Sequence, residues 1–154
     1  MKNKNWEKEL QSHFDNLRVI ENCKTETLQR FEQFCEFIAE LAFEALASGL
    51  KAKGVRSRIR KEKGRSIGME IRIPGPRPGW FEYRMILPRN SVDLRMTLRT
   101  RGRWADKAEP QETAEPFMEG VDSAAVLKTA KEDLILDIIE HFRNFVYAGL
   151  TSPD

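Results

Sequence analysis

The stretch VRSRIRKEKGRSIGMEIRIPGPRPGWFEYRMILPRNSVDLRMTLRTR, residues 55–101, decides the fold class. Apolar and polar residues alternate along four segments of it, at about residues 55–61, 66–73, 80–87 and 91–101. Such alternation is typical of strands that bury one face and leave the other in water. Short connections with Gly, Pro and Asn separate the segments, as in strands that follow one another in opposite directions. The pattern predicts a four-stranded antiparallel meander.

Helical periodicity flanks the meander on both sides. The helices that it predicts span about residues 4–21, 26–52 and 123–148. Thr25 or Thr27 is expected to cap the second helix, and Asp122 or Ser123 the third. Apolar residues fill about half the circumference of the second helix at 100° per residue, so it must contact more than one neighbour.

These elements predict an α+β fold of two layers in the order α-α-β-β-β-β-α, with residues 1–154 as a single domain. The long second and last helices are expected to cover the apolar face of the sheet. Residues 102–120 are expected to form a long acidic loop, with carboxylates at Asp106, Glu109, Glu112, Glu115 and Glu119. Loops of that length are usually mobile or functional. Deleting the loop is expected to leave the fold intact.

Charge is distributed unevenly along the chain. Residues 51–103 hold sixteen basic side chains, twelve of them arginine, against four acidic ones, so this segment carries +12. The rest of the chain carries −10, and the total of +2 conceals the division. Local fields rather than totals steer partners. An arginine-rich middle therefore indicates an anionic partner, either outside the molecule or on its own acidic surface.

The polar face of the predicted sheet gathers most of these arginines together with a tryptophan. Guanidinium groups suit phosphate and carboxylate, and they stack on aromatic rings, whereas a merely solvated face could use lysine equally well. Trp80, and Trp104 just beyond the fourth strand, are candidates for stacking on bases. The candidate anion-binding residues are Arg56, Arg58, Arg60, Arg72, Trp80, Arg84, Arg95, Arg99 and Arg101.

The leading functional hypothesis is a non-enzymatic binding module whose arginine face engages nucleic acid. The alternative is that these arginines bind no ligand and instead form cross-strand ion pairs with Glu70, Glu82 and Asp93. A second hypothesis is an assembly subunit, as a homodimer or with an acidic protein partner. There the glutamate stripe at residues 32, 36, 40 and 44 would meet cations from elsewhere. No cofactor motif stands in the sequence.

A third hypothesis is a metal-dependent hydrolase. His13 and His141 each follow a carboxylate by one helical turn, and packing of the first helix on the last would bring the two histidines together. Glu70-Ile71-Arg72 and Glu82-Tyr83-Arg84 resemble the E-x-K element of metal-dependent nucleases, with arginine replacing lysine. Arginine keeps its proton and serves that role poorly. For His13 and His141 the favoured interpretation is core-edge histidines hydrogen-bonded to neighbouring acids.

Composition excludes several classes of protein. No apolar run approaches the roughly 18 residues of a membrane span, and the N-terminal residues MKNKNWEKEL lack the apolar stretch of a secretory signal. Cys23 and Cys35 do not form a CxxC pair. Buried free thiols in a cytoplasmic protein are the expected state.

Overall fold

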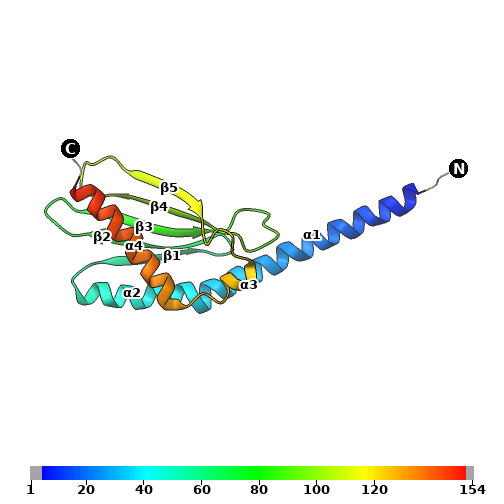
Figure 1. Ribbon diagram of the computed structural model, residues 1–154, viewed down its shortest axis with the longest axis horizontal. Coiled ribbons are helices and arrows are strands. Elements are labelled where there is room, and N and C mark those ends of the chain that lie inside the picture. The colour runs from blue at the N-terminus through cyan, green and yellow to red at the C-terminus, as the bar shows by residue number, and fades with distance from the viewer. Residues whose placement is uncertain (1–4, 152–154) are drawn as a thin grey trace.

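The computed structural model describes residues 5–151 and confirms the α+β class. A long helical segment precedes five strands, and a helix ends the described chain (Figure 1). The elements are α1 (Trp6–Phe34), the π-helix η1 (Cys35–Ala39), α2 (Glu40–Ala52), β1 (Ser57–Glu62), β2 (Ser66–Ile73), β3 (Gly79–Ile86), β4 (Thr97–Arg103), β5 (Gln111–Pro116), α3 (Ser123–Val126) and α4 (Lys131–Leu150).

The first two predicted helices are one continuous helix, because α1 runs directly into η1 and α2. Thr25 and Thr27, expected as caps, lie inside α1. Their hydroxyls donate to the carbonyl oxygens of Glu21 and Cys23 at 3.1 and 2.8 Å. Threonine within a helix satisfies its hydroxyl in this way, so the predicted break was wrong. The predicted start of the first helix, at residue 4, lies outside the described residues.

The π-helix keeps the buried residues of this long helix on one side. Phe31 and Phe34 are buried before it, and Ala42 and Leu46 after it. At a uniform 100° per residue the centres of the two groups would lie about 70° apart around the helix. The wider turn, with its i→i+5 hydrogen bonds, absorbs an extra residue and brings both groups to one side. The broad apolar arc expected from a regular helix is therefore narrower, and Phe37 stays exposed.

The sheet is an antiparallel meander of five strands in the order β1-β2-β3-β4-β5, so the predicted number of four was wrong. The fifth strand lies within residues 102–120, which were expected to be a loop. All six residues of β5 are exposed, and the strand is held by backbone pairing with β4 and by a 2.5 Å contact between the hydroxyls of Thr100 and Thr113. Deleting residues 106–119 would remove this strand, contrary to the expectation that the fold would be unaffected.

The alternation assigned the two faces of the sheet correctly. Ile71, Tyr83 and Met96 are at most 3% exposed. Arg72 is exposed on the opposite side, and Arg84 also points there, although neighbouring side chains cover it and leave it 6% exposed. The fourth strand begins later than predicted, at Thr97, and residues 91–96 follow an irregular path.

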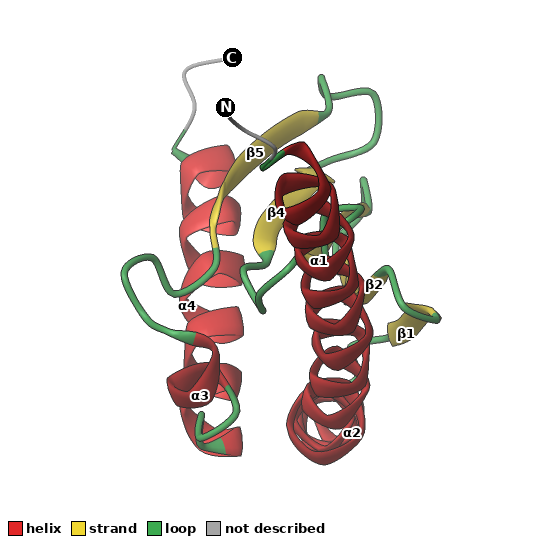
Figure 2. Ribbon diagram, turned by 90° about the vertical axis from the view of Figure 1, so that its right-hand side faces the viewer, coloured by secondary structure: helices red, strands yellow, loops and turns green. Residues whose placement is uncertain are grey.

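Helices α2 and α4 lie side by side and cover the inner face of the sheet (Figure 2). The ring of Phe81 on β3 packs against Phe142 and Phe145 of α4, with centroids 5.7 and 5.3 Å apart. The predicted last helix is divided. Asp122 caps the short α3, as expected, by accepting a 2.8 Å hydrogen bond from the Ala125 N–H, and α4 starts only at Lys131. No helix within residues 5–151 combines the length and apolar content that crossing a bilayer requires.

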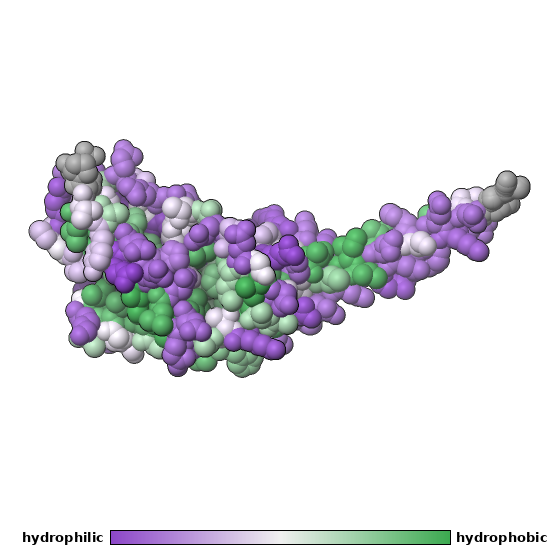
Figure 3. All heavy atoms as spheres, viewed as in Figure 1, coloured by the Kyte–Doolittle hydropathy of each residue, from purple (hydrophilic) through white to green (hydrophobic). Residues whose placement is uncertain are grey.

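Residues 5–26 form an arm that extends away from the rest of the described chain, the body (Figure 1). Every residue from Asn5 to Asn22 is exposed, and the first buried residue of α1 is Thr27. Hydrophobic residues are visible along part of the arm (Figure 3). The arm thus presents apolar side chains that the body does not cover.

Candidate nucleic-acid interface

The outer face of the sheet, opposite α2 and α4, carries its charges in rows set by the strand register. The middle row mixes the two signs across all five strands. Its members are Arg58, Glu70, Glu82, Arg101 and Glu112, each directly opposite the next. Three of its four cross-strand neighbours have opposite charges, which stabilises such a face, and only Glu70 and Glu82 carry the same charge.

Glu82 is the buried centre of the middle row. Its side chain is 2% exposed and accepts from Arg84 Nη2 at 2.9 Å and Arg101 Nε at 2.7 Å. Burial favours the neutral acid, but the two guanidinium groups outweigh it and hold the pKa of Glu82 below its usual value. Arg84 Nη1 also donates to Glu62 and to Ser66, at 3.0 and 3.1 Å. Arg84, a predicted anion-binding residue, is therefore held by three groups of its own protein.

Other predicted site residues also have internal partners. Arg58 and Arg60 share Glu70, at 4.0 and 3.6 Å, and Arg99 Nε lies 3.4 Å from a carboxylate oxygen of Glu112. Cross-strand pairing, the alternative weighed from the sequence, thus accounts for part of the arginine cluster.

Arg95 does not lie on the sheet. It precedes β4, its side chain is 83% exposed, and it pairs with Asp93 at 2.8 Å. Its placement on the polar face was wrong because the fourth strand begins only at Thr97. Trp104 was also considered for stacking, but it lies against Gly149 of α4, at the end of the core.

A second row across the sheet carries arginine without carboxylate. Trp80 lies between Arg72 on β2 and Arg103 on β4 in the register. Arg56 joins them, because its carbonyl oxygen accepts the Arg72 N–H at 2.9 Å. None of the ion pairs formed within residues 5–151 involves Arg56, Arg72 or Arg103. We call Arg56, Arg72, Trp80 and Arg103 together the arginine row.

Trp80 gives the arginine row an aromatic surface. Its side chain is half-buried, and the guanidinium of Arg101 lies 5.9 Å from the ring centroid. Such an arrangement is a cation–π contact. Arg103 Nε is buried and has no hydrogen-bond partner. The row therefore combines three uncompensated cations, one of them with a free donor, and a partly accessible ring.

A small polar hollow lies further along the outer face. It measures about 120 Å³ and is lined by Glu62, Arg65, Ser66, Arg84, Ile86 and Arg99. The Nε atoms of its three arginines are buried without hydrogen-bond partners, and only that of Arg99 makes an ion pair, with Glu112 at 3.4 Å. Buried donors normally find acceptors, and guanidinium donors bind oxyanions well. The exposed side chain of Glu62 supplies the only carboxylate among the lining residues.

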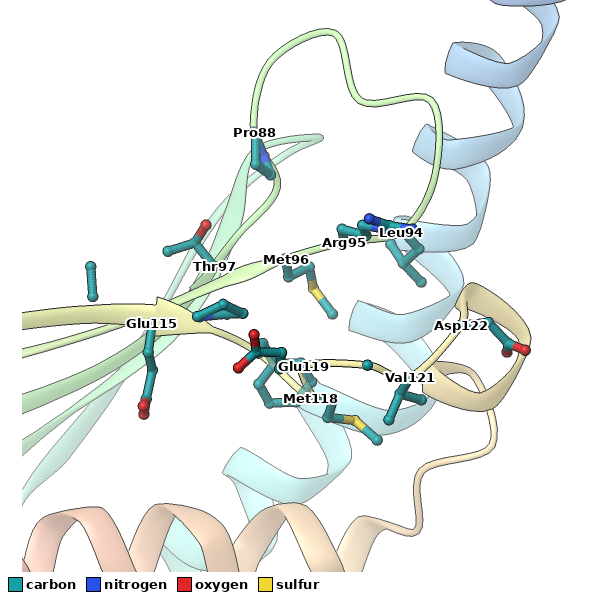
Figure 4. Close-up of a pocket in the computed structure, with 14 residues that line it drawn as sticks. Pro88, Leu94, Arg95, Met96, Thr97, Glu115, Met118, Glu119, Val121 and Asp122 are labelled. Carbon is teal, nitrogen blue, oxygen red and sulfur yellow. The ribbon is translucent and has the colours of Figure 1, made fainter.

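A larger pocket lies at the opposite end of the strands from the arginine row, beside the end of β5. It measures about 710 Å³. Met96 lines it from the segment before β4, and Met118 and Val121 line it from the loop after β5 (Figure 4). Glu115, Glu119 and Asp122 are also among its lining residues. The pocket is mainly apolar and shares no residue with the arginine row.

The structure does not bring the two histidines together. His13 is exposed on the arm, whereas His141 on α4 contacts Glu115 of β5 through Nε2 at 3.2 Å and the Asp137 carbonyl oxygen through Nδ1 at 2.8 Å. Within residues 5–151, no group of three or more His, Cys, Asp and Glu side chains is placed to hold a metal ion. The acids of the two E-x-R elements, Glu70 and Glu82, face arginines instead.

We expect His141 to make folding stability depend on pH. Burial lowers the pKa of His141, but Asp137 and Glu115 outweigh burial and raise it above the usual value. A raised folded-state pKa contributes stability that is fully present below the unfolded value, about 6.5, and is lost as pH rises through the folded value. Urea unfolding should thus show His141→Gln losing more stability at mildly acidic than at mildly alkaline pH. An equal loss at both would contradict the assignment.

Comparison of the chain with models of protein families, with curated proteins and with solved structures finds no match. Sequence reasoning missed Arg65, which lies in a turn, and Arg103, which continues the strand alternation two residues beyond the predicted end at 101. Arg103 could have been found by extending the alternation, whereas no periodic pattern marks Arg65.

Proposed function

We propose that the protein is a non-enzymatic binding module that holds the backbone of a nucleic acid on its outer sheet face. The observation that carries this proposal is the arginine row. Internal carboxylates compensate the middle row, so the positive charge free to meet a ligand is concentrated at Arg56, Arg72 and Arg103. Guanidinium groups match phosphate in shape and charge, and Trp80 offers a ring for an unpaired base. Single-stranded nucleic acid is the preferred ligand.

The polar hollow supports the same assignment. The Nε atoms of Arg65 and Arg84, which have no partner, suit a phosphate group, and Glu62, whose side chain is 65% exposed, can leave Arg84 as the phosphate enters. Such a contact adds affinity without reading sequence, because phosphate contacts position the chain rather than specify it. We propose a cytoplasmic location, where Cys23 and Cys35, both free, would stay reduced.

Replacing Arg56, Arg72 and Arg103 together by glutamine is expected to weaken binding of every oligonucleotide alike. Each lost phosphate contact removes close to one unit from the slope of log affinity against log salt, so the slope should fall by about two to three. Fluorescence anisotropy of labelled oligonucleotides of two unrelated sequences, over a series of salt concentrations, measures this change.

The matched control removes the same charge elsewhere, at Arg89, Arg95 and Arg143, which are exposed and lie off the outer face. Its salt slope should remain close to that of the unmodified protein. Equal losses in both triple variants would mean that only net charge matters. No binding of any oligonucleotide by the unmodified protein at low salt would refute the proposal.

A second candidate function, an assembly subunit, is favoured by the arm, whose apolar residues the body leaves uncovered. Part of the glutamate stripe already has a partner in the same chain, since Lys61 Nζ lies 3.1 Å from Glu32 and 3.9 Å from Glu40. An assembly subunit of this kind requires a partner that covers the apolar residues of the arm.

A further inference from the structure

The arm exposes a stripe of large apolar side chains along one side. Trp6, Leu10, Phe14, Leu17 and Ile20 are between 42% and 65% exposed. At 100° per residue these five lie within one sector of the helix, whereas Val19 lies on the opposite side. A helix of this length, with one apolar side and no cover, is marginal alone in water and is normally stabilised by packing.

We propose that the arm pairs with the arm of a second copy of this chain, as an antiparallel two-helix coiled coil about a two-fold axis near Asp15. The second copy is then the partner that covers the arm in the assembly-subunit function, on which this pairing rests. The pairing is independent of nucleic-acid binding, because it uses a different surface. Three observations carry it: the spacing of the stripe, the point where the body begins and the position of Lys24.

Four residues of the stripe lie on a heptad seam, whose positions follow one another at alternating steps of four and three. The seam positions are Trp6, Leu10, His13, Leu17, Ile20 and Lys24. Phe14, the fifth residue of the stripe, lies beside the seam, next to His13. In an antiparallel pair, positions whose numbers add up to 30 face each other. Leu10 then faces Ile20 of the second copy, and His13 faces Leu17. The same contacts occur twice about the axis, as a two-fold interface requires.

The body fixes which register is possible. Thr27 is the first buried residue of α1, and Phe31, one turn further, is fully buried. A shift of one heptad toward the body would place Trp6 against Phe31, where the second copy has no access. A shift of one heptad the other way would leave Ile20 without a described partner. The proposed register is the longest overlap that ends where the bodies begin.

Lys24 selects the antiparallel direction. Parallel pairing would place two Lys24 side chains opposite each other at one seam position and bring both bodies to the same end. In the antiparallel register Lys24 faces Trp6 of the second copy. An ammonium over an indole ring is attracted to it, and Glu7 and Glu9 follow Trp6 closely in the sequence.

The apolar side chains of the stripe supply more than half of the area that a stable dimer interface buries. A large side chain buries about 150–250 Å² when fully covered. The five exposed residues of the stripe therefore offer on the order of 500 Å² per arm before flanking methylene groups are counted. Stable interfaces bury about 800 Å² per partner. The overlap of some twenty residues is about 30 Å long.

Sedimentation velocity over a range of protein concentrations tests the pairing. The unmodified protein should sediment as a dimer, and the double variant Leu10→Glu with Leu17→Glu should raise the dissociation constant at least about a hundredfold, because four buried leucines are lost per dimer. Val19→Glu is the matched control, since it adds a carboxylate to the opposite side of the same helix, and it should leave the dimer intact. A monomeric unmodified protein, or equal dissociation by the control, would overturn the proposal.

Cysteine cross-linking tests the direction and register in a Cys23→Ser background. Leu10→Cys and Ile20→Cys should form a disulfide with each other when the two variants are mixed, and neither should cross-link with itself. Self-linking of each variant alone would indicate parallel arms and overturn the register. The double glutamate variant should keep its near-ultraviolet circular dichroism and still bind short oligonucleotides. A dimeric unmodified protein that binds no oligonucleotide would count against the nucleic-acid proposal alone.

Discussion

Glu82→Gln is expected to lower the free energy of unfolding by about 3–5 kcal/mol, the usual cost of removing one partner from a buried ion pair. Arg84, whose side chain is 8% exposed, would keep only Glu62 as a charged partner, and Arg101 would lose its own. The glutamine side chain has nearly the same shape, so the loss reports charge rather than packing. Urea unfolding followed by circular dichroism measures it.

Glu70→Gln is the matched control for this experiment. Glu70 lies directly opposite Glu82 in the register, but its side chain is 21% exposed and its arginine contacts are 3.6 and 4.0 Å long. Pairs of this kind contribute under about 1 kcal/mol. Similar losses in the two variants would mean that the buried network is not the stabilising feature.

The difference between Glu82→Gln and the unmodified protein is also expected to depend on pH. Because the folded-state pKa of Glu82 is lowered, its contribution is present above the unfolded value and disappears as pH falls through the folded value. The difference in the free energy of unfolding between the two proteins should therefore be largest at neutral pH and smaller in acid. A constant difference would contradict the assignment.

Gly149→Ala is expected to destabilise the protein by about 1–3 kcal/mol, although alanine is usually the better helix former. A Cβ atom at residue 149 would lie 2.4 Å from Trp104 Cγ and 2.6 Å from Trp104 Cβ. These atoms are at the base of the tryptophan side chain, so a rotation of the ring cannot relieve the overlap. The end of α4 would have to move away from the sheet. Thermal or urea unfolding measures the loss.

Gly49→Ala is the same substitution at a position where the expected change in stability has the opposite sign. Gly49 lies within α2, and a Cβ atom there has no neighbour within 4 Å. Without a clash, the helix propensity of alanine should raise stability by about 0.5–1 kcal/mol. If both variants were stabilised, close packing of α4 on Trp104 would not be the reason for glycine at residue 149.

The strands with one buried face were predictable because burial imposes a period of two on the sequence. Ile71 and Tyr83 lie inside for that reason, and Arg72 lies outside. β5 was missed because both of its faces are exposed to solvent, so no apolar alternation marks it. The continuous α1–α2 helix was missed because a threonine that caps a helix and one that bonds back inside a helix look alike in sequence.

The site was predictable only in part. Alternation identified which arginines share the outer face, but it does not fix the cross-strand register. That register places Glu70 and Glu82 in the middle row and leaves Arg72 and Arg103 without acids. The hollow beside Arg65 depends on a turn that no periodicity describes.

The two edges of the meander carry opposite charge. β1 presents Arg58, Arg60 and Lys61, whereas β5 presents Glu112 and Glu115. An open strand edge is a template for further pairing. Two β1 edges repel each other, and so do two β5 edges, which opposes symmetric extension of the sheet from either side. Pro110 and Pro116 at the ends of β5 add a second obstacle, because proline has no N–H to donate to an incoming strand. Charge therefore opposes symmetric pairing of the edges, and the two prolines oppose the remaining mode, in which β5 of one copy pairs with β1 of another.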